Sequence, residues 1–160
     1  TVGLGLAASQ ISPYEPAEEP TAATSTGLTA SGQPDSGPPY PNHYPEHLEA
    51  EIASAERVGV EPISPAHPRF VQLVNQGRIK YVVLESGELL VGPHTAKGIE
   101  ISHAVLSRGR AVLTAGEAQI AAHGGRYIGL EIAPWSGHFR PSAESVRLAH
   151  AAFKRFGVQF

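Results

Sequence analysis

Apolar residues recur with helical spacing near both ends of the segment that starts at about residue 43. In residues 46–57 they recur every three or four positions among Ala and Glu, which is typical of an amphipathic helix. Similar apolar stripes follow Ser64-Pro65, a suitable start for a helix, and Ser142, a common capping residue type. Gly77 and Gly157 end these two stripes. The spacing therefore predicts two N-terminal helices and one C-terminal helix.

Between these helices the pattern changes to short runs rich in β-branched residues. Five such runs are separated by glycine or proline turns and are expected to be strands: residues 79–84, 88–91, 100–106, 111–120 and 126–132. The sequence Glu-Ser-Gly at 85–87 is typical of a hairpin connection. The prediction for residues 43–160 is a single α+β domain with a mostly antiparallel sheet of about five strands.

The first 42 residues have a different composition from the rest of the chain. They are rich in Pro, Gly, Ser and Thr, and eight of the 14 prolines fall in residues 1–45. So few apolar side chains cannot offset the entropy of ordering, which predicts a linker or irregular arm over residues 1–42. A loop that wraps the domain is the alternative, because Val2, Leu4 and Ile11 could pack on it. With Thr at position 1 and no Met, we expect a piece of a longer protein.

The residue types that are absent exclude several classes of chemistry. The chain has no Cys, which excludes disulfides, Cys-ligated zinc, iron–sulfur clusters and thiol nucleophiles. His43 and His47 have the spacing of metal ligands on a helix, but Pro45 lies between them. The His-x-Glu at residues 47–49 resembles that of zinc-dependent deaminases, whose Pro-Cys-x-x-Cys this chain cannot supply. We expect no metal site and no membrane span, because no run of 18 apolar residues occurs.

Charge is distributed unevenly along the chain. Residues 1–56 contain eight acidic residues and no Lys or Arg, whereas residues 57–160 contain all 12 basic residues and seven acidic ones. The net charge of −3 therefore hides a basic part of +5 (12 − 7) that carries the fold-like pattern. An anionic ligand, such as a nucleotide or a nucleic acid, becomes a possible partner.

Three residues are candidates for catalysis. His103 lies in an apolar run, where a polar side chain costs free energy unless it is hydrogen-bonded. Glu117 interrupts another apolar run, and His138 lies in a polar cluster before the last helix. Backbone amides at a helix N-terminus, together with Arg140, would favour an anion there. A structural hydrogen-bonding role remains the alternative for each.

Ordered motifs in residues 79–160 resemble a known pattern. They are IKYVV at 79–83, ISHAVL at 101–106, GRAVLTAGE at 109–117 and SGHFRPS at 136–142. Together they resemble a C-terminal toxin domain of bacterial polymorphic toxins. A related arrangement occurs in a plant-pathogen effector family with a modified mono-ADP-ribosyltransferase fold and in plant IQ-motif calmodulin-binding proteins. The related pattern has His-Ser-Ser where this chain has Ser-His-Ala at 102–104, and residues 79–160 contain neither Ser-Thr-Ser nor Glu-x-Glu.

The resemblance implies an effector or toxin domain that uses NAD and acts on a target macromolecule. In this hypothesis His103 positions the nicotinamide ribose and Glu117 stabilises an oxocarbenium-like transition state. The cofactor would be bound by three serines and an arginine: Ser102, Ser136, Arg140 and Ser142. The resemblance also implies delivery into a target cell as part of a larger protein, interbacterial competition and a possible cognate immunity protein.

Two alternatives remain open at this point. One is a metal-independent ribonuclease in which His103 and His138 form an acid–base pair and Lys80 or Arg140 stabilises the transition-state charge. The other is a catalytically silent binding module, in which His103, Glu117 and His138 contribute to stability only. Convergence of these three side chains on one open cleft would favour catalysis, whereas burial in the core would favour the binding module.

Overall fold

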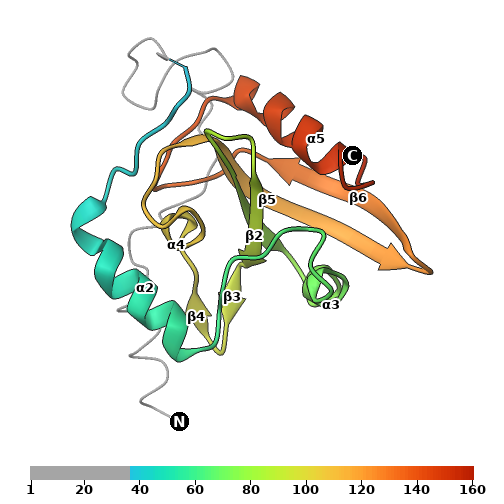
Figure 1. Cartoon of the computed structure of the whole chain (residues 1–160), viewed down its shortest axis with the longest axis horizontal. Coiled ribbons are helices and arrows are strands. Elements are labelled where there is room, and N and C mark those ends of the chain that lie inside the picture. The colour runs from blue at the N-terminus through green and yellow to red at the C-terminus, as the bar shows by residue number, and fades with distance from the viewer. Residues whose placement is uncertain (1–36) are drawn as a thin grey trace.

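The computed structural model describes residues 37–160, in which four antiparallel strands form the main sheet (Figure 1). Its strand order is β2-β1-β5-β6, and every neighbouring pair is antiparallel. A separate two-stranded sheet joins β3 to β4. The strands are β1 (Ile79–Leu84), β2 (Leu89–Pro93), β3 (Thr95–Ala96), β4 (Ile99–Glu100), β5 (Val112–His123) and β6 (Arg126–Ala133).

Helices cover both faces of the main sheet, so that the α+β prediction is confirmed. The described helices are η2 (Pro45–His47), α2 (Leu48–Arg57), α3 (Phe70–Asn75), α4 (His103–Ser107), η3 (Ala143–Ser145) and α5 (Val146–Lys154). Helix α5 crosses one face above β5 and β6, while α4 lies on the other side near α2 (Figure 1). None of the helices in residues 37–160 is long and apolar enough to cross a membrane.

Strand β1 is central, and all six of its residues are buried. Because successive side chains in a strand point to opposite faces, Tyr81 joins one apolar cluster and Val82 another. The Tyr81 cluster includes Phe70 of α3 and Phe153 of α5, which together cover one face. The Val82 cluster includes residues of α4 and the loop after β6. Burial on both faces explains the continuous apolar run of this strand.

The expected strand at residues 100–106 is wrong. Only Ile99 and Glu100 form β4; Ser102 is extended, and α4 follows from His103. The helix ends at Arg108, which has a positive φ of 57°, followed by Gly109. All five residues of α4 are buried, and a short apolar run buried on every side has no period that separates helix from strand.

The N-terminal boundary of the fold lies within the expected arm. Tyr40 pairs with Val112 through backbone hydrogen bonds of 2.7 and 3.0 Å and is 6% exposed. The remainder of that arm, residues 1–36, lies outside the described residues. Ser142 precedes η3 as expected of a capping residue, but its side chain makes no capping hydrogen bond. Instead, its hydroxyl accepts a hydrogen bond from the Tyr40 hydroxyl at 3.1 Å.

Candidate functional site

A cavity of about 550 Å³ opens where β1 begins and β2 ends. Polar side chains from distant parts of the sequence meet in it, with one aromatic ring at its wall. It is lined by Leu73, Gln76, Gly77, Arg78, Pro93, His94, Thr95, Glu117 and Trp135. Of the residues expected from the sequence to form a site, Glu117 is the one that lines this cavity.

Glu117 is a buried carboxylate that lies between a guanidinium and an imidazole. It is 2% exposed, in β5 directly opposite Lys80 of β1. Its Oε1 lies 3.3 Å from Nη1 of Arg78, and its Oε2 lies 3.4 Å from Nε2 of His94. A guanidinium at this distance favours the ionised carboxylate, which burial alone would disfavour. The arrangement therefore places a fixed negative charge beside the cavity.

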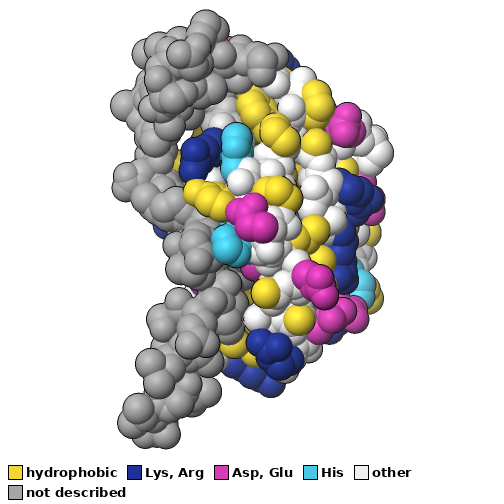
Figure 2. All heavy atoms as spheres, turned by 90° about the vertical axis from the view of Figure 1, so that its left-hand side faces the viewer, with side chains coloured by type: hydrophobic (Ala, Val, Ile, Leu, Met, Phe, Trp, Pro, Cys, Tyr) yellow, Lys and Arg dark blue, Asp and Glu magenta, His cyan; other side chains and the backbone are white. Residues whose placement is uncertain are grey.

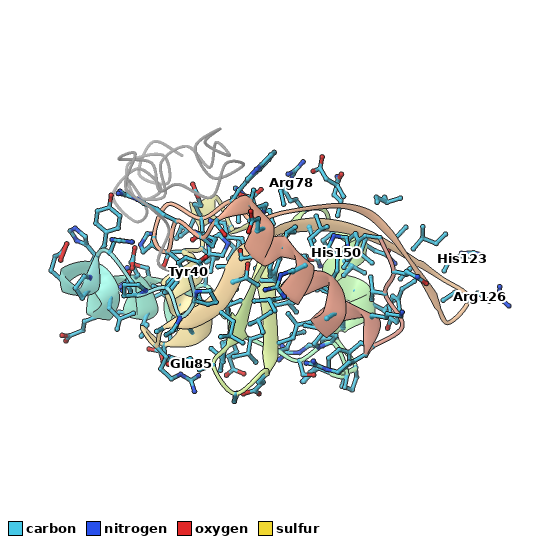
Figure 3. The ribbon with its side chains drawn as sticks, turned by 90° about the horizontal axis from the view of Figure 1, so that it is seen from above. Tyr40, Arg78, Glu85, His123, Arg126 and His150 are labelled. Carbon is cyan, nitrogen blue, oxygen red and sulfur yellow. The ribbon has the colours of Figure 1, made fainter. Side chains whose placement is uncertain are left out.

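Arg78 connects three parts of the site. Besides Glu117, its guanidinium contacts Glu131 of β6, with Nη2 2.9 Å from Oε1. It also lies over the Trp135 ring, 5.8 Å from the centroid. Its side chain is 32% exposed, and it lies just before the central strand β1, at the periphery of the molecule in Figure 3. The planar guanidinium can make these ion-pair and cation–π contacts together.

Backbone hydrogen bonds fix His94. Its amide donates to the Arg78 carbonyl at 3.3 Å, which extends the β1–β2 ladder by one pair. Its carbonyl accepts from the Ile101 amide at 3.0 Å, which ties it to the segment after β4. The imidazole is thereby aimed at Glu117 by the junction of the two sheets.

The backbone before Glu117 is tightly packed. A Cβ on Gly116 would lie 1.9 Å from the Ala133 carbonyl oxygen, so only glycine fits there. Tyr81 donates from its hydroxyl to the same Ala133 carbonyl at 3.0 Å. His103 donates from Nε2 to the Gly116 carbonyl at 2.7 Å. The Ala-Gly-Glu sequence at 115–117 thus has a packing reason as well as a chemical one.

His103 is 0% exposed and lies behind the strand rather than in the cavity. It supports the backbone of Glu117 through Gly116.

Lys80 is also 0% exposed, and its Nζ lies 3.0 Å from Oε2 of Glu100. Ser102 is 2% exposed, and its hydroxyl has no hydrogen-bond partner among residues 37–160.

His138 belongs to a second buried polar cluster. Its Nε2 lies 2.7 Å from Oε2 of Glu51, with the two residues 0% and 4% exposed. The Tyr44 ring packs edge-on against His138 at 5.2 Å between centroids. This pair joins α2 to the loop after β6 and does not line the cavity that contains Glu117. The expected convergence of His103, Glu117 and His138 on one cleft is therefore wrong, and the burial of both histidines is the outcome that favours a binding module.

The residues expected to bind a cofactor make structural contacts instead. The Ser136 hydroxyl accepts from the Phe139 amide at 3.3 Å. Arg140 donates to the Gly137 carbonyl and, at 2.7 Å, to the Tyr44 hydroxyl. Ser142 is bound by Tyr40, and none of the expected cofactor residues lines the cavity. The structure therefore does not assemble them into an anion site around Glu117.

The pKa values of His43 and Tyr81 are shifted from their ordinary values. Partial burial lowers the pKa of His43 below its ordinary value of 6.5, and the nearby Arg140 and His138 lower it further. Burial raises the pKa of the Tyr81 hydroxyl, which therefore stays protonated and can donate to Ala133. Both shifts favour the neutral form of the side chain.

Arg78, His94 and Trp135 were not expected at the site. Arg78 directly precedes a strand and His94 follows a Gly-Pro turn, so each is read most simply as a loop residue. The pairing register of β1 with β5 accounts for Arg78. Lys80 lies opposite Glu117, and Arg78 is two residues before Lys80, so it is on the same face of the sheet. No group of three or more His, Asp or Glu in the described part of the chain could hold a metal ion.

Comparisons with protein-family models, curated proteins and solved structures find no match to this chain. The geometry and chemistry of the Glu117 cavity are therefore the basis for a functional proposal.

Proposed function

We propose that the Glu117 cavity is the active site of an effector or toxin enzyme that cleaves the N-glycosidic bond of NAD and transfers ADP-ribose to a macromolecule. The observation that carries the proposal is the buried Glu117 carboxylate, held at the cavity by Arg78 and His94. The resemblance of residues 79–160 to ADP-ribosyltransferase-like effectors supports the same chemistry. Such a domain would act in the target cell, where a cognate immunity protein would neutralise it.

A fixed carboxylate suits the transition state of this reaction. When the bond between C1′ and the nicotinamide nitrogen breaks, its electron pair leaves with nicotinamide and positive charge develops on the ribose. A preorganised anion in a site with little water stabilises that charge strongly. The acceptor then forms a bond to C1′ and loses a proton. In this proposal Glu117 faces the ribose, and Trp135 provides an aromatic face for the nicotinamide ring.

The charged side chains that line the cavity are Arg78 and Glu117, which sum to zero (+1 − 1) when His94 is neutral. Glu117 is the one acidic residue among the lining residues, so its carboxylate is the group placed to stabilise an oxocarbenium ion there. The volume of about 550 Å³ lies within the ordinary range for small-molecule sites.

This proposal changes the role of His103. The sequence hypothesis has His103 contacting the nicotinamide ribose, but its hydrogen bond to Gly116 makes it a positioning residue for Glu117. The diphosphate also needs a different site, because Arg140 and its neighbouring serines are engaged elsewhere.

One observation favours ribonuclease activity as a second candidate. His94 and Glu117 both line the cavity, which places an imidazole and a carboxylate, two groups that serve in general acid–base catalysis, in one site. The pair expected from sequence, His103 and His138, is fully buried in separate hydrogen bonds.

The test is incubation of the full chain with a cell lysate and NAD labelled on its adenylate half. We expect released nicotinamide and labelled macromolecules. Both should fall at least 100-fold in Glu117→Gln, which keeps the size of the side chain and removes its charge. Glu131→Gln, on the exposed side of Arg78, is the matched control and should retain most activity. Cleavage of RNA in EDTA without NAD would favour the second candidate, and equal activity of Glu117→Gln and parent would overturn the proposal.

A further inference from the structure

A second groove of about 480 Å³ adjoins the Glu117 cavity. The two share four lining residues, which are Leu73, Gln76, Pro93 and Thr95. The groove continues between the end of α2, helix α3 and the β3–β4 turn, elements that lie on the lower side of the sheet in Figure 1. One elongated ligand could therefore occupy both compartments.

The groove has an apolar part and two cationic side chains. Val58, Val60 and Ile63 contribute apolar surface, while Arg69 and Lys97 contribute positive charge. Arg69 lies 4.0 Å from Glu61, which offsets part of its charge. Lys97 is exposed and forms no ion pair with any residue in 37–160. An anion entering this groove would therefore meet the Lys97 ammonium.

Lys97 occupies a backbone position that disfavours lysine. The two-residue turn between β3 and β4 consists of Lys97 and Gly98, with φ values of 51° and 80°. Two positive φ values define the hairpin turn that prefers Asn, Asp or Gly at its first position. Lysine at this position lowers the stability of the fold relative to Asn, which adopts a positive φ more readily.

We propose that this groove binds the adenosine diphosphate half of NAD, with Lys97 at the diphosphate and the apolar part against the adenine. This inference rests on the proposed function, because the Glu117 cavity then holds the nicotinamide half. The Arg78 guanidinium at the cavity is already paired with the carboxylates of Glu117 and Glu131, so the groove is the compartment with cationic side chains for a diphosphate. Lys97 and Arg69 supply the positive charge that the diphosphate requires.

The test is the affinity of the full chain for ADP, measured by titration calorimetry. In Lys97→Asn we expect roughly tenfold weaker binding, because one charge-assisted contact to the diphosphate is lost. Thermal stability should be unchanged or higher, because Asn suits the turn. Lys154→Asn removes the same charge from the exposed end of α5 and should leave ADP affinity unchanged. A second variant, Lys97→Glu, should abolish detectable ADP binding.

Several outcomes would overturn this inference: no ADP binding by the parent, equal loss in Lys154→Asn, or full affinity in Lys97→Glu. If NAD is cleaved with an unchanged KM in Lys97→Asn, the groove assignment fails while the proposed function stands. If ADP binding depends on Lys97 but NAD is not cleaved, the groove is a nucleotide site and the proposed function fails. If RNA oligonucleotides bind through Lys97 and ADP does not, the phosphates belong to a nucleic acid and the assignment to NAD is wrong.

Discussion

At the scale of single residues, the site depends on close packing behind Glu117. Gly116 leaves room for the Ala133 carbonyl, and His103 satisfies the Gly116 carbonyl in a place with no solvent. Neither residue touches the cavity. Both determine where the Glu117 carboxylate lies, because they fix the strand from which it projects.

Gly116→Ala is expected to destabilise the fold. The new Cβ would lie 1.9 Å from the Ala133 oxygen and 2.6 Å from the Tyr81 hydroxyl, so the β5–β6 pairing must shift. We expect the free energy of unfolding to fall by about 3 kcal/mol in chemical denaturation. Gly92→Ala is the control, because its Cβ would meet only the movable Leu106 side chain. A loss no larger than that of the control would contradict this packing account.

His103→Ala is expected to leave a buried carbonyl of Gly116 without its donor. The free energy of unfolding should fall by about 1–3 kcal/mol. As a positioning residue, His103 should affect kcat for NAD cleavage more than KM, because the displaced Glu117 acts mainly on the transition state. Unchanged stability would show that the hydrogen bond to Gly116 contributes little. A rise in KM with unchanged kcat would instead indicate direct substrate contact.

At the scale of secondary-structure elements, the helices and most strands follow from periodicity. Strand β5 is longer than expected, since it continues to His123 in a hairpin that projects beyond the rest of the sheet (Figure 3). The prediction of a strand at residues 100–106 is wrong because α4 is buried on all sides. A helix with no exposed polar positions has no alternation of polar and apolar residues from which its period could be recognised. Local periodicity also could not predict the order at Tyr40. Its pairing partner, Val112, is 72 positions away in the sequence (112 − 40).

The contact between α2 and the loop after β6 predicts a pH-dependent stability. His43 lies beside this contact and has a lowered pKa in the folded chain, so its proton binds more readily in the unfolded chain. The contribution of His43 is therefore fully present above about pH 6.5 and is lost as the pH falls below that value. His43→Asn should flatten this part of the pH profile of unfolding. An unchanged profile would show that the acid sensitivity comes from other groups.

At the scale of the whole molecule, the basic composition of residues 57–160 does not make the face drawn in Figure 2 uniformly cationic. Acidic and basic side chains are interspersed over the face drawn in Figure 2. The charged groups of the proposed site are local: Arg78 and its carboxylate partners at the cavity, and Lys97 in the groove. The charge of +5 (12 − 7) on residues 57–160 made an anionic ligand a possible partner without indicating where it would bind.

The site as a whole could be predicted only in part. Glu117 was a candidate because burying a carboxylate in an apolar strand costs free energy unless the carboxylate is paired. His103 and His138 were candidates for the same reason, but their partners, Gly116 and Glu51, explain their burial structurally. Arg78, His94 and Trp135 meet Glu117 only through strand register and the turn after β2, neither of which single-sequence periodicity determines.

The rate of nicotinamide release from NAD tests the central proposal most directly. It should be measured for the parent chain, Glu117→Gln and Glu131→Gln at equal concentration, with thermal unfolding to verify that all three are folded. We expect release by the parent and by Glu131→Gln, and at least 100-fold slower release by folded Glu117→Gln. Equal release by Glu117→Gln and parent, or no release by a folded parent chain, would contradict it.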